Sequence, residues 1–148
     1  MQVRRSALVD RPAELLFDLI ERAEHYPQFL PWCTGARIVS RDEQLVSADL
    51  RMRFGGVAFE LRTRNPKCRP HHMTIHLERG PFRRFEGEWR LQPIGTDACS
   101  VAFALDFEFD SPWLTRAAGG LFENACNRMV DAFVQRALDA PPHRPSAV

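Results

Sequence analysis

The side chains that could carry acid–base chemistry lie at positions expected to face solvent. Asp106 and Glu108 are two residues apart, the spacing of neighbours on one face of a strand. His72 and His76 have the same phase as the polar residues of their own segment. A general acid or base needs a site in which polar groups converge on a reacting atom. We therefore interpret these groups as a solvated sheet face and assign no catalytic residue.

The cysteines give no metal or redox motif. They stand at positions 33, 68, 99 and 126, without a C-x-x-C pair and without a histidine at metal-ligand spacing. The sequence also lacks a Gly-rich phosphate loop and a Ser-His-Asp arrangement. We predict reduced thiols, no bound metal and no cofactor.

Hydropathy points to the cytoplasm. No apolar run approaches the roughly 20 residues that span a membrane. The segment Met1–Ser6 is charged but is not followed by the apolar stretch of a secretory signal. We expect a cytoplasmic protein, with peripheral contact at the inner membrane as the alternative.

The net charge of +1 hides a basic middle segment. Residues 51–90 carry ten Lys and Arg against four acids, a net +6. This segment is either a solvated sheet face or a contact surface for a phosphate-rich partner. The four arginines with the clearest outward phase form the candidate basic face: Arg51, Arg53, Arg62 and Arg64.

The periodicity of apolar residues predicts the elements. A strand over Gln2–Val9 precedes a short helix that begins near Pro12, and Glu21–Pro31 should form a turn and a second short helix. Alternation with a period of two then predicts strands over 46–54, 57–64, 72–77, 85–91 and 101–109. Glycine-containing turns separate most of them, and Asn65-Pro66 should end the second.

One long helix should close the domain. Ser111 and Pro112 provide an N-cap and a first helical residue, and the apolar stripe continues to about Ala140. Gly119-Gly120 could kink this helix. We predict a single domain over residues 1–140 and a disordered proline-rich tail over 141–148.

These elements predict an α+β fold in which a curved antiparallel sheet wraps around the long C-terminal helix. Consecutive strands with short turns form an antiparallel sheet, and its apolar face needs a cover. Only the C-terminal helix is long enough to provide one. The two short helices follow the first strand.

Several segments carry a family resemblance. The run His25–Cys33 resembles the Y-P-x-F-L-P-W-C signature of the ribosome-association toxin RatA and coenzyme Q-binding protein family, which is START-like and belongs to the polyketide cyclase/dehydrase superfamily. Gly80-Pro81-Phe82 with Gly87-x-Trp89, Phe107-Glu108-Phe109 and the helical pattern Met129–Phe133 are similar to it as well. The resemblance implies the helix-grip fold already expected.

The resemblance also implies a function. A member of this family would be a non-enzymatic protein that binds a hydrophobic small molecule, such as ubiquinone or a related polyprenyl lipid, and supports respiration. The alternative is a toxin-like regulator that binds the large ribosomal subunit and blocks subunit association. The family motif brings no agreed catalytic set.

Candidate ligand-binding residues come from the inward strand phase and the helix stripe. They are Phe59, Leu61, Met73, Ile75, Trp89, Phe103, Met129 and Phe133. Aromatic residues in the proline-limited segment are the candidate rim of the pocket: Tyr26, Phe29 and Trp32. Because the predicted sheet aromatics point inward, any contact with RNA would be to phosphate and not to bases.

Overall fold

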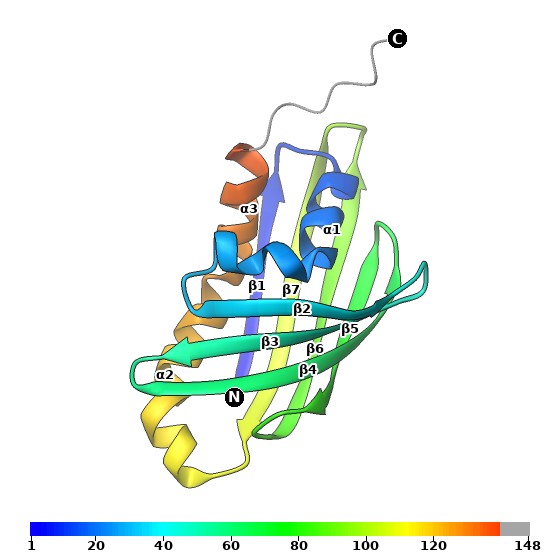
Figure 1. Cartoon of the computed structure of the whole chain (residues 1–148). Helices are drawn as coiled ribbons and strands as arrows, with labels where there is room; N and C mark the ends of the chain where they lie inside the picture. Colours follow the sequence, from blue (N-terminus) through cyan, green and yellow to red (C-terminus); the bar gives the residue numbers. More distant parts are fainter. Residues whose placement is uncertain (140–148) are drawn as a thin grey trace.

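The computed structural model describes residues 1–139, and the predicted disordered tail lies outside them. A seven-stranded antiparallel sheet curves around helices at the C-terminal end of the described chain (Figure 1). The elements in order are β1 (Gln2–Val9), α1 (Ala13–Glu21), the 3-10 helix η1 (Ala23–Gln28), β2 (Cys33–Arg41), β3 (Leu45–Phe54), β4 (Val57–Cys68), β5 (His72–Arg79), β6 (Phe82–Ile94), β7 (Ala98–Phe109), α2 (Pro112–Asn127) and α3 (Met129–Asp139).

The strand order is β1-β7-β6-β5-β4-β3-β2. Strands β2 to β7 therefore pair in the order of the sequence, and the last strand, β7, also pairs with the first, β1. Gly55 and Gly95 adopt φ of 62° and 65° at two of the turns, a backbone region that glycine reaches without strain. The predicted fold class is confirmed.

The inner sheet face and the helices share two aromatic groups. Phe122 of α2 contacts the rings of Phe54, Phe82, Phe107 and Phe109 at centroid distances of 4.7–5.7 Å. Phe133 of α3 contacts Trp89, Tyr26 and Phe29. Each helix therefore has its own aromatic anchor in the core, one near each end of the sheet.

Two strand predictions were wrong. The structure contains β2, an edge strand that apolar periodicity did not reveal because its burial alternates poorly. It also extends β4 through Pro66 to Cys68, where a break was predicted. Pro66 is tolerated because the β4–β5 ladder is interrupted between Arg64 and Lys67, so no amide donor is needed there.

The predicted single C-terminal helix is two helices. Ser111 caps α2 as expected, accepting a hydrogen bond from the Leu114 amide at 3.1 Å. The interruption falls at Arg128, beyond the Gly119-Gly120 pair, which stays within the helix. At the break, Arg5 of β1 donates from Nε to the Asn127 carbonyl at 3.0 Å, which satisfies an acceptor at the end of α2.

Candidate ligand-binding groove

A groove of about 900 Å³ lies where the α2–α3 break faces the end of the β3–β4 hairpin. Three segments form it: the loop after η1, the end of β3 with its turn, and the facing side of both helices. The lining residues are Leu30, Pro31, Trp32, Arg53, Phe54, Gly55, Leu121, Asn124, Ala125, Arg128, Asp131, Ala132 and Gln135.

The loop wall is held in place by β3. The Arg53 amide donates to the Trp32 carbonyl at 2.9 Å, and the Trp32 ring stacks on Phe54 with centroids 6.2 Å apart and an interplanar angle of 19°. Leu30 is buried beneath them. This wall is therefore apolar and is fixed to the sheet.

The helix wall is made of small and amide side chains. Ala125 and Ala132 lie on either side of the break, and their size leaves space that larger residues would fill. Asn124 and Gln135 stand beside them and can donate hydrogen bonds from their amides. The arrangement is an apolar floor with hydrogen-bond donors at its margin.

The groove margin has a positive balance, since its charged lining residues are Arg53, Arg128 and Asp131. Within residues 1–139, neither of these arginines forms an ion pair with an acidic side chain. Both are exposed, so both remain available to an acceptor on a ligand or a surface.

The eight candidate ligand residues lie in the interior, yet none of them lines this groove. They pack largely against one another: Trp89 lies 4.6 Å from Phe103 and 5.2 Å from Phe133 between ring centroids. All eight are buried or half-buried: Phe59, Leu61, Met73, Ile75, Trp89, Phe103, Met129 and Phe133. They form the core beside the groove, and their role in ligand binding stays a prediction.

The three candidate rim residues lie in two different environments. Trp32 lines the groove. Tyr26 and Phe29 pack edge-on against Phe133, at centroid distances of 5.4 and 5.1 Å. The Tyr26 hydroxyl donates to the Ile20 carbonyl, and burial raises the pKa of this phenol above its usual range. Only Trp32 therefore belongs to an opening, and the other two close the adjacent end.

The candidate basic face is less positive than the sequence predicted. Arg51 pairs with Glu60 at 2.7 Å, and Arg62 pairs with Asp49 at the same distance. Hydrogen bonds from Arg62, followed by those from Arg37, lower the pKa of Asp49 to about 2. Arg53 lines the groove and Arg64 is exposed. Two of the four arginines are therefore paired with acids on the same face, and the role of this face as a contact surface stays a prediction.

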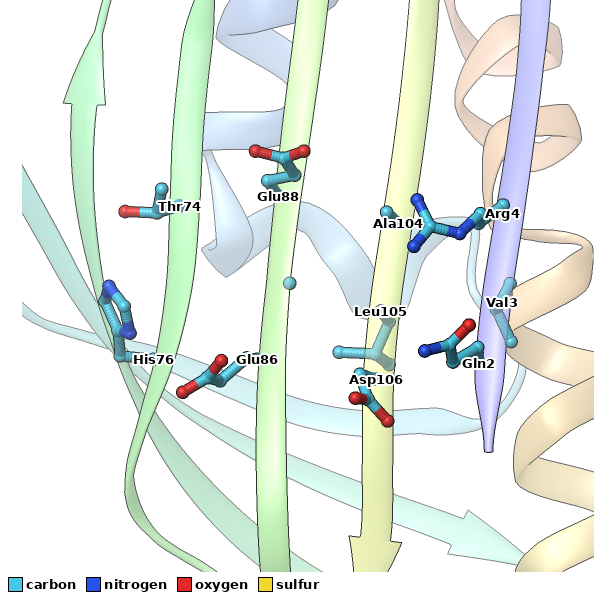
Figure 2. A pocket seen from close by; sticks show the side chains of 11 residues that line it. Gln2, Val3, Arg4, Thr74, His76, Glu86, Glu88, Ala104, Leu105 and Asp106 are labelled. Carbon is cyan, nitrogen blue, oxygen red and sulfur yellow. The ribbon is translucent and has the colours of Figure 1, made fainter.

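A shallower depression of about 300 Å³ lies on the opposite, outer face of the sheet (Figure 2). Figure 2 shows the side chains of His76, Glu86, Glu88 and Asp106 around it, with the helices behind the sheet. It sits over Gly87, where a Cβ would come within 3.0 Å of the Ala104 carbonyl oxygen. A side chain at this position would also meet Leu105 and Ile75 on the inner face, at 3.0 and 3.4 Å, so the site favours glycine.

The carboxylates near this depression are held by cations. Arg90 and His72 donate to Glu88 and lower the pKa of its carboxyl group. Arg84 lies 3.3 Å from Asp106, and Arg83 donates to Glu108 at 3.3 Å. Asp106 and Glu108 are thus in a surface ion-pair network, which agrees with their interpretation as a solvated face.

Metal-binding and membrane-spanning features are absent from the described part of the chain. No set of three or more His, Cys, Asp and Glu side chains in residues 1–139 is arranged to hold a metal ion. None of the helices in that range has the length and apolar character to cross a bilayer.

The sequence is similar to a known protein family and to several named proteins. The family model described as polyketide cyclase / dehydrase and lipid transport matches residues 9–134. The chain is 38% identical over 135 residues to the ribosome association toxin RatA of Pseudomonas aeruginosa, covering 91% of this chain and 94% of that protein. It is 26% identical to the mitochondrial coenzyme Q-binding protein COQ10 homolog B of Xenopus laevis, over 84% of this chain and 52% of that protein.

Among solved structures, a START superfamily protein from Mycobacterium smegmatis aligns with a TM-score of 0.71 at 20% identity, covering 93% of this chain and 94% of that one. This likeness shows that the two chains share a fold. The chain therefore belongs to the polyketide cyclase / dehydrase and lipid transport family, among the relatives of RatA and the coenzyme Q-binding proteins.

Proposed function

We propose that this protein binds a hydrophobic small molecule in the groove at the α2–α3 break, without catalysing its conversion. The observation that carries the proposal is the apolar floor of Leu30, Phe54 and Ala125 in a groove of about 900 Å³. That volume lies within the roughly 300–1,000 Å³ of small-molecule sites. The name of the coenzyme Q-binding relative supports a polyprenyl quinone as the ligand, and with it a role in respiration.

The margin of the groove fits a quinone head group. A quinone ring offers carbonyl oxygens, which only accept hydrogen bonds. Asn124, Gln135 and Arg128 present donors at the groove margin. The ring would lie at this margin and the tail along the floor beside Trp32.

The groove is too small for a long polyprenyl chain. Each isoprene unit contributes on the order of 4 kcal/mol of gross transfer free energy, from about 0.8 kcal/mol for each buried CH₂-sized group. About two or three units would therefore give useful affinity after the cost of ordering the tail. The remaining units would leave through the open side of the groove.

The experiment that tests this proposal is identification of the native ligand. The protein is purified without detergent from the cells that naturally produce it, extracted with solvent, and the extract is analysed by mass spectrometry. The expected result is a polyprenyl quinone or related lipid in a constant ratio to protein. A preparation that carries no lipid and binds none when quinone is added would reject the proposal.

A second candidate function is a toxin-like regulator that binds the large ribosomal subunit and blocks subunit association. It is favoured by 38% identity to a relative named as a ribosome association toxin. Replacing Arg51, Arg53, Arg62 and Arg64 together by Gln should weaken co-sedimentation with large subunits at low salt. Unchanged co-sedimentation of this variant would exclude the face as the contact.

A further inference from the structure

The outward face of α2 is unusual for a surface helix. A helix that covers a core normally turns charged residues to solvent. The exposed residues of α2 include one charged side chain, that of Arg116. The others are apolar, small or uncharged: Pro112, Trp113, Thr115, Ala117, Gly120, Leu121 and Asn124.

Two large apolar side chains stand out on this face. Trp113 is 61% exposed and Leu121 is 48% exposed, and they are eight residues apart. Eight residues correspond to about 12 Å along a helix, so the two side chains mark one stripe. The residues between them on that stripe, Ala117 and Gly120, are too small to shield it.

This stripe adjoins the open side of the groove. Leu121 lines the groove and lies beside Gly55 in the β3–β4 turn, where a Cβ added to the glycine would be 3.5 Å from Leu121 Cδ1. Figure 1 shows the β3–β4 turn next to α2 at the same end of the molecule. The stripe and the turn thus form the two edges of the groove opening.

Three exposed arginines lie along these two edges of the groove opening. Arg116 and Arg128 are exposed on the helix side and Arg53 is exposed on the hairpin side. The acids nearest in sequence are Asp110, exposed just before α2, Glu123, half-buried on the flank of α2, and Asp131, exposed on α3, so the exposed arginines outnumber the exposed acids by three to two. An exposed tryptophan with arginines around it is the composition that favours a membrane interface with anionic lipids.

We propose that the outward face of α2, with the β3–β4 turn, docks on an anionic membrane surface so that the groove opens toward the bilayer. Trp113 and Leu121 enter the interface, and Arg53, Arg116 and Arg128 lie at the lipid phosphates. This inference rests on the proposed function for its purpose: the part of a polyprenyl ligand that the groove does not enclose stays in lipid. A second copy of the chain is a weaker occupant. A stable dimer buries about 800 Å² and roughly 20–30 residues on each side, more than the exposed residues of α2 and the β3–β4 turn supply.

The test uses flotation of the whole protein with vesicles of phosphatidylcholine, with and without phosphatidylglycerol. Trp113→Ser and Arg116→Gln are the informative variants because neither residue lines the groove. Leu8→Ser and Arg79→Gln are the matched controls, since Leu8 is 78% exposed on β1 and Arg79 is exposed on β5.

The wild-type protein should float with the anionic vesicles and detach as salt rises. Arg116→Gln should lower the partition coefficient for anionic vesicles about fivefold, the effect of one basic residue near an anionic surface, and Trp113→Ser should lower it at least as much. Both control variants should bind like wild type. Wild-type protein that ignores anionic vesicles, or a Trp113→Ser variant that floats unchanged, would overturn the proposal.

Two further readouts separate the possible failures. Quinone binding by Trp113→Ser should equal that of wild type, so loss of vesicle binding alone leaves the groove function intact. Vesicle binding without quinone binding would instead reject the proposed function. A concentration-dependent dimer that Trp113→Ser abolishes would assign the face to a second copy and contradict the membrane proposal.

Discussion

The guanidinium of Arg136 lies over the ring of Phe29, 5.1 Å from its centroid. The same group donates from Nη2 to Oε1 of Gln28 at 2.6 Å. Phe29 in turn packs edge-on against Phe133. Arg136 therefore fastens the segment after η1 to α3 and closes the interior on that side, while the groove stays open at Trp32.

Replacing Arg136 by Gln should loosen this closure. The cation–π contact and the hydrogen bond are each worth about 0.5–1 kcal/mol at a partly exposed site, so unfolding should become easier by about 1 kcal/mol. Urea denaturation measures the change. Arg136→Lys keeps the cation and should lose about half as much. Equal stability of Arg136→Gln and wild type would mean that the contact does not hold the segment.

Phe29 and Trp32 should respond differently to truncation. Phe29→Ala removes a ring from the core cluster and should cost stability, whereas Trp32→Ala removes a groove wall and should mainly raise the ligand off-rate. Phe133→Ala is the positive control for core damage: the side chain is 0% exposed and its loss should cost about 3–5 kcal/mol. Thermal melts and quinone dissociation rates distinguish the two classes. Similar off-rates for both single variants would contradict the assignment of Trp32.

The four thiols should divide by reactivity. Burial raises the pKa of Cys126 to about 12 and raises those of Cys33 and Cys99, so these groups stay protonated at pH 8. Cys68 is exposed. An alkylating reagent should modify one thiol quickly in the folded protein and all four in denaturant. Fast modification of Cys126 in the folded protein would contradict the packing of α2.

Asp49 should make stability depend on acid pH. Its folded-state pKa of about 2 lies below the unfolded value near 3.8, so the carboxylate stabilises the fold above the unfolded value. That contribution is lost as pH falls through the interval toward 2. Asp49→Asn should therefore be less stable than wild type near neutral pH, and the difference should shrink on acidification. Glu43→Gln in the exposed β2–β3 turn is the control, with no pH-dependent difference expected from an ion pair. A difference for Asp49→Asn that is constant with pH would reject the linkage.

The fold follows from the sequence because alternation reports burial directly. β7 alternates buried and half-buried residues along its whole length, as its sequence predicts. The break at Arg128 could not be read in this way, since it carries neither Gly nor Pro. It coincides with a hydrogen bond from Arg5, which lies more than a hundred residues earlier. Contacts between distant segments of this kind leave no local pattern.

The groove was harder to predict for a related reason. Periodicity identifies which side chains point inward, but it does not distinguish a filled interior from an open one. Phe59 and Trp89 have inward phase and are packed against other rings. The space lies instead where Ala125 and Ala132 are small and the helix is interrupted. Aromatic crowding near prolines is visible in the sequence, and one residue of that segment, Trp32, lines the groove.

Quinone binding in the groove can be measured by titrating ubiquinones of graded tail length into delipidated wild type and an Ala132→Phe variant. The phenyl ring should occupy the part of the groove beside the helix break and weaken binding at least about tenfold. Ala58→Phe, at an exposed position of β4, is the matched control and should bind like wild type. Wild-type affinity should rise over about the first two or three isoprene units and then level off. Undiminished binding by Ala132→Phe, or affinity that grows up to the longest tail, would contradict this mode of binding.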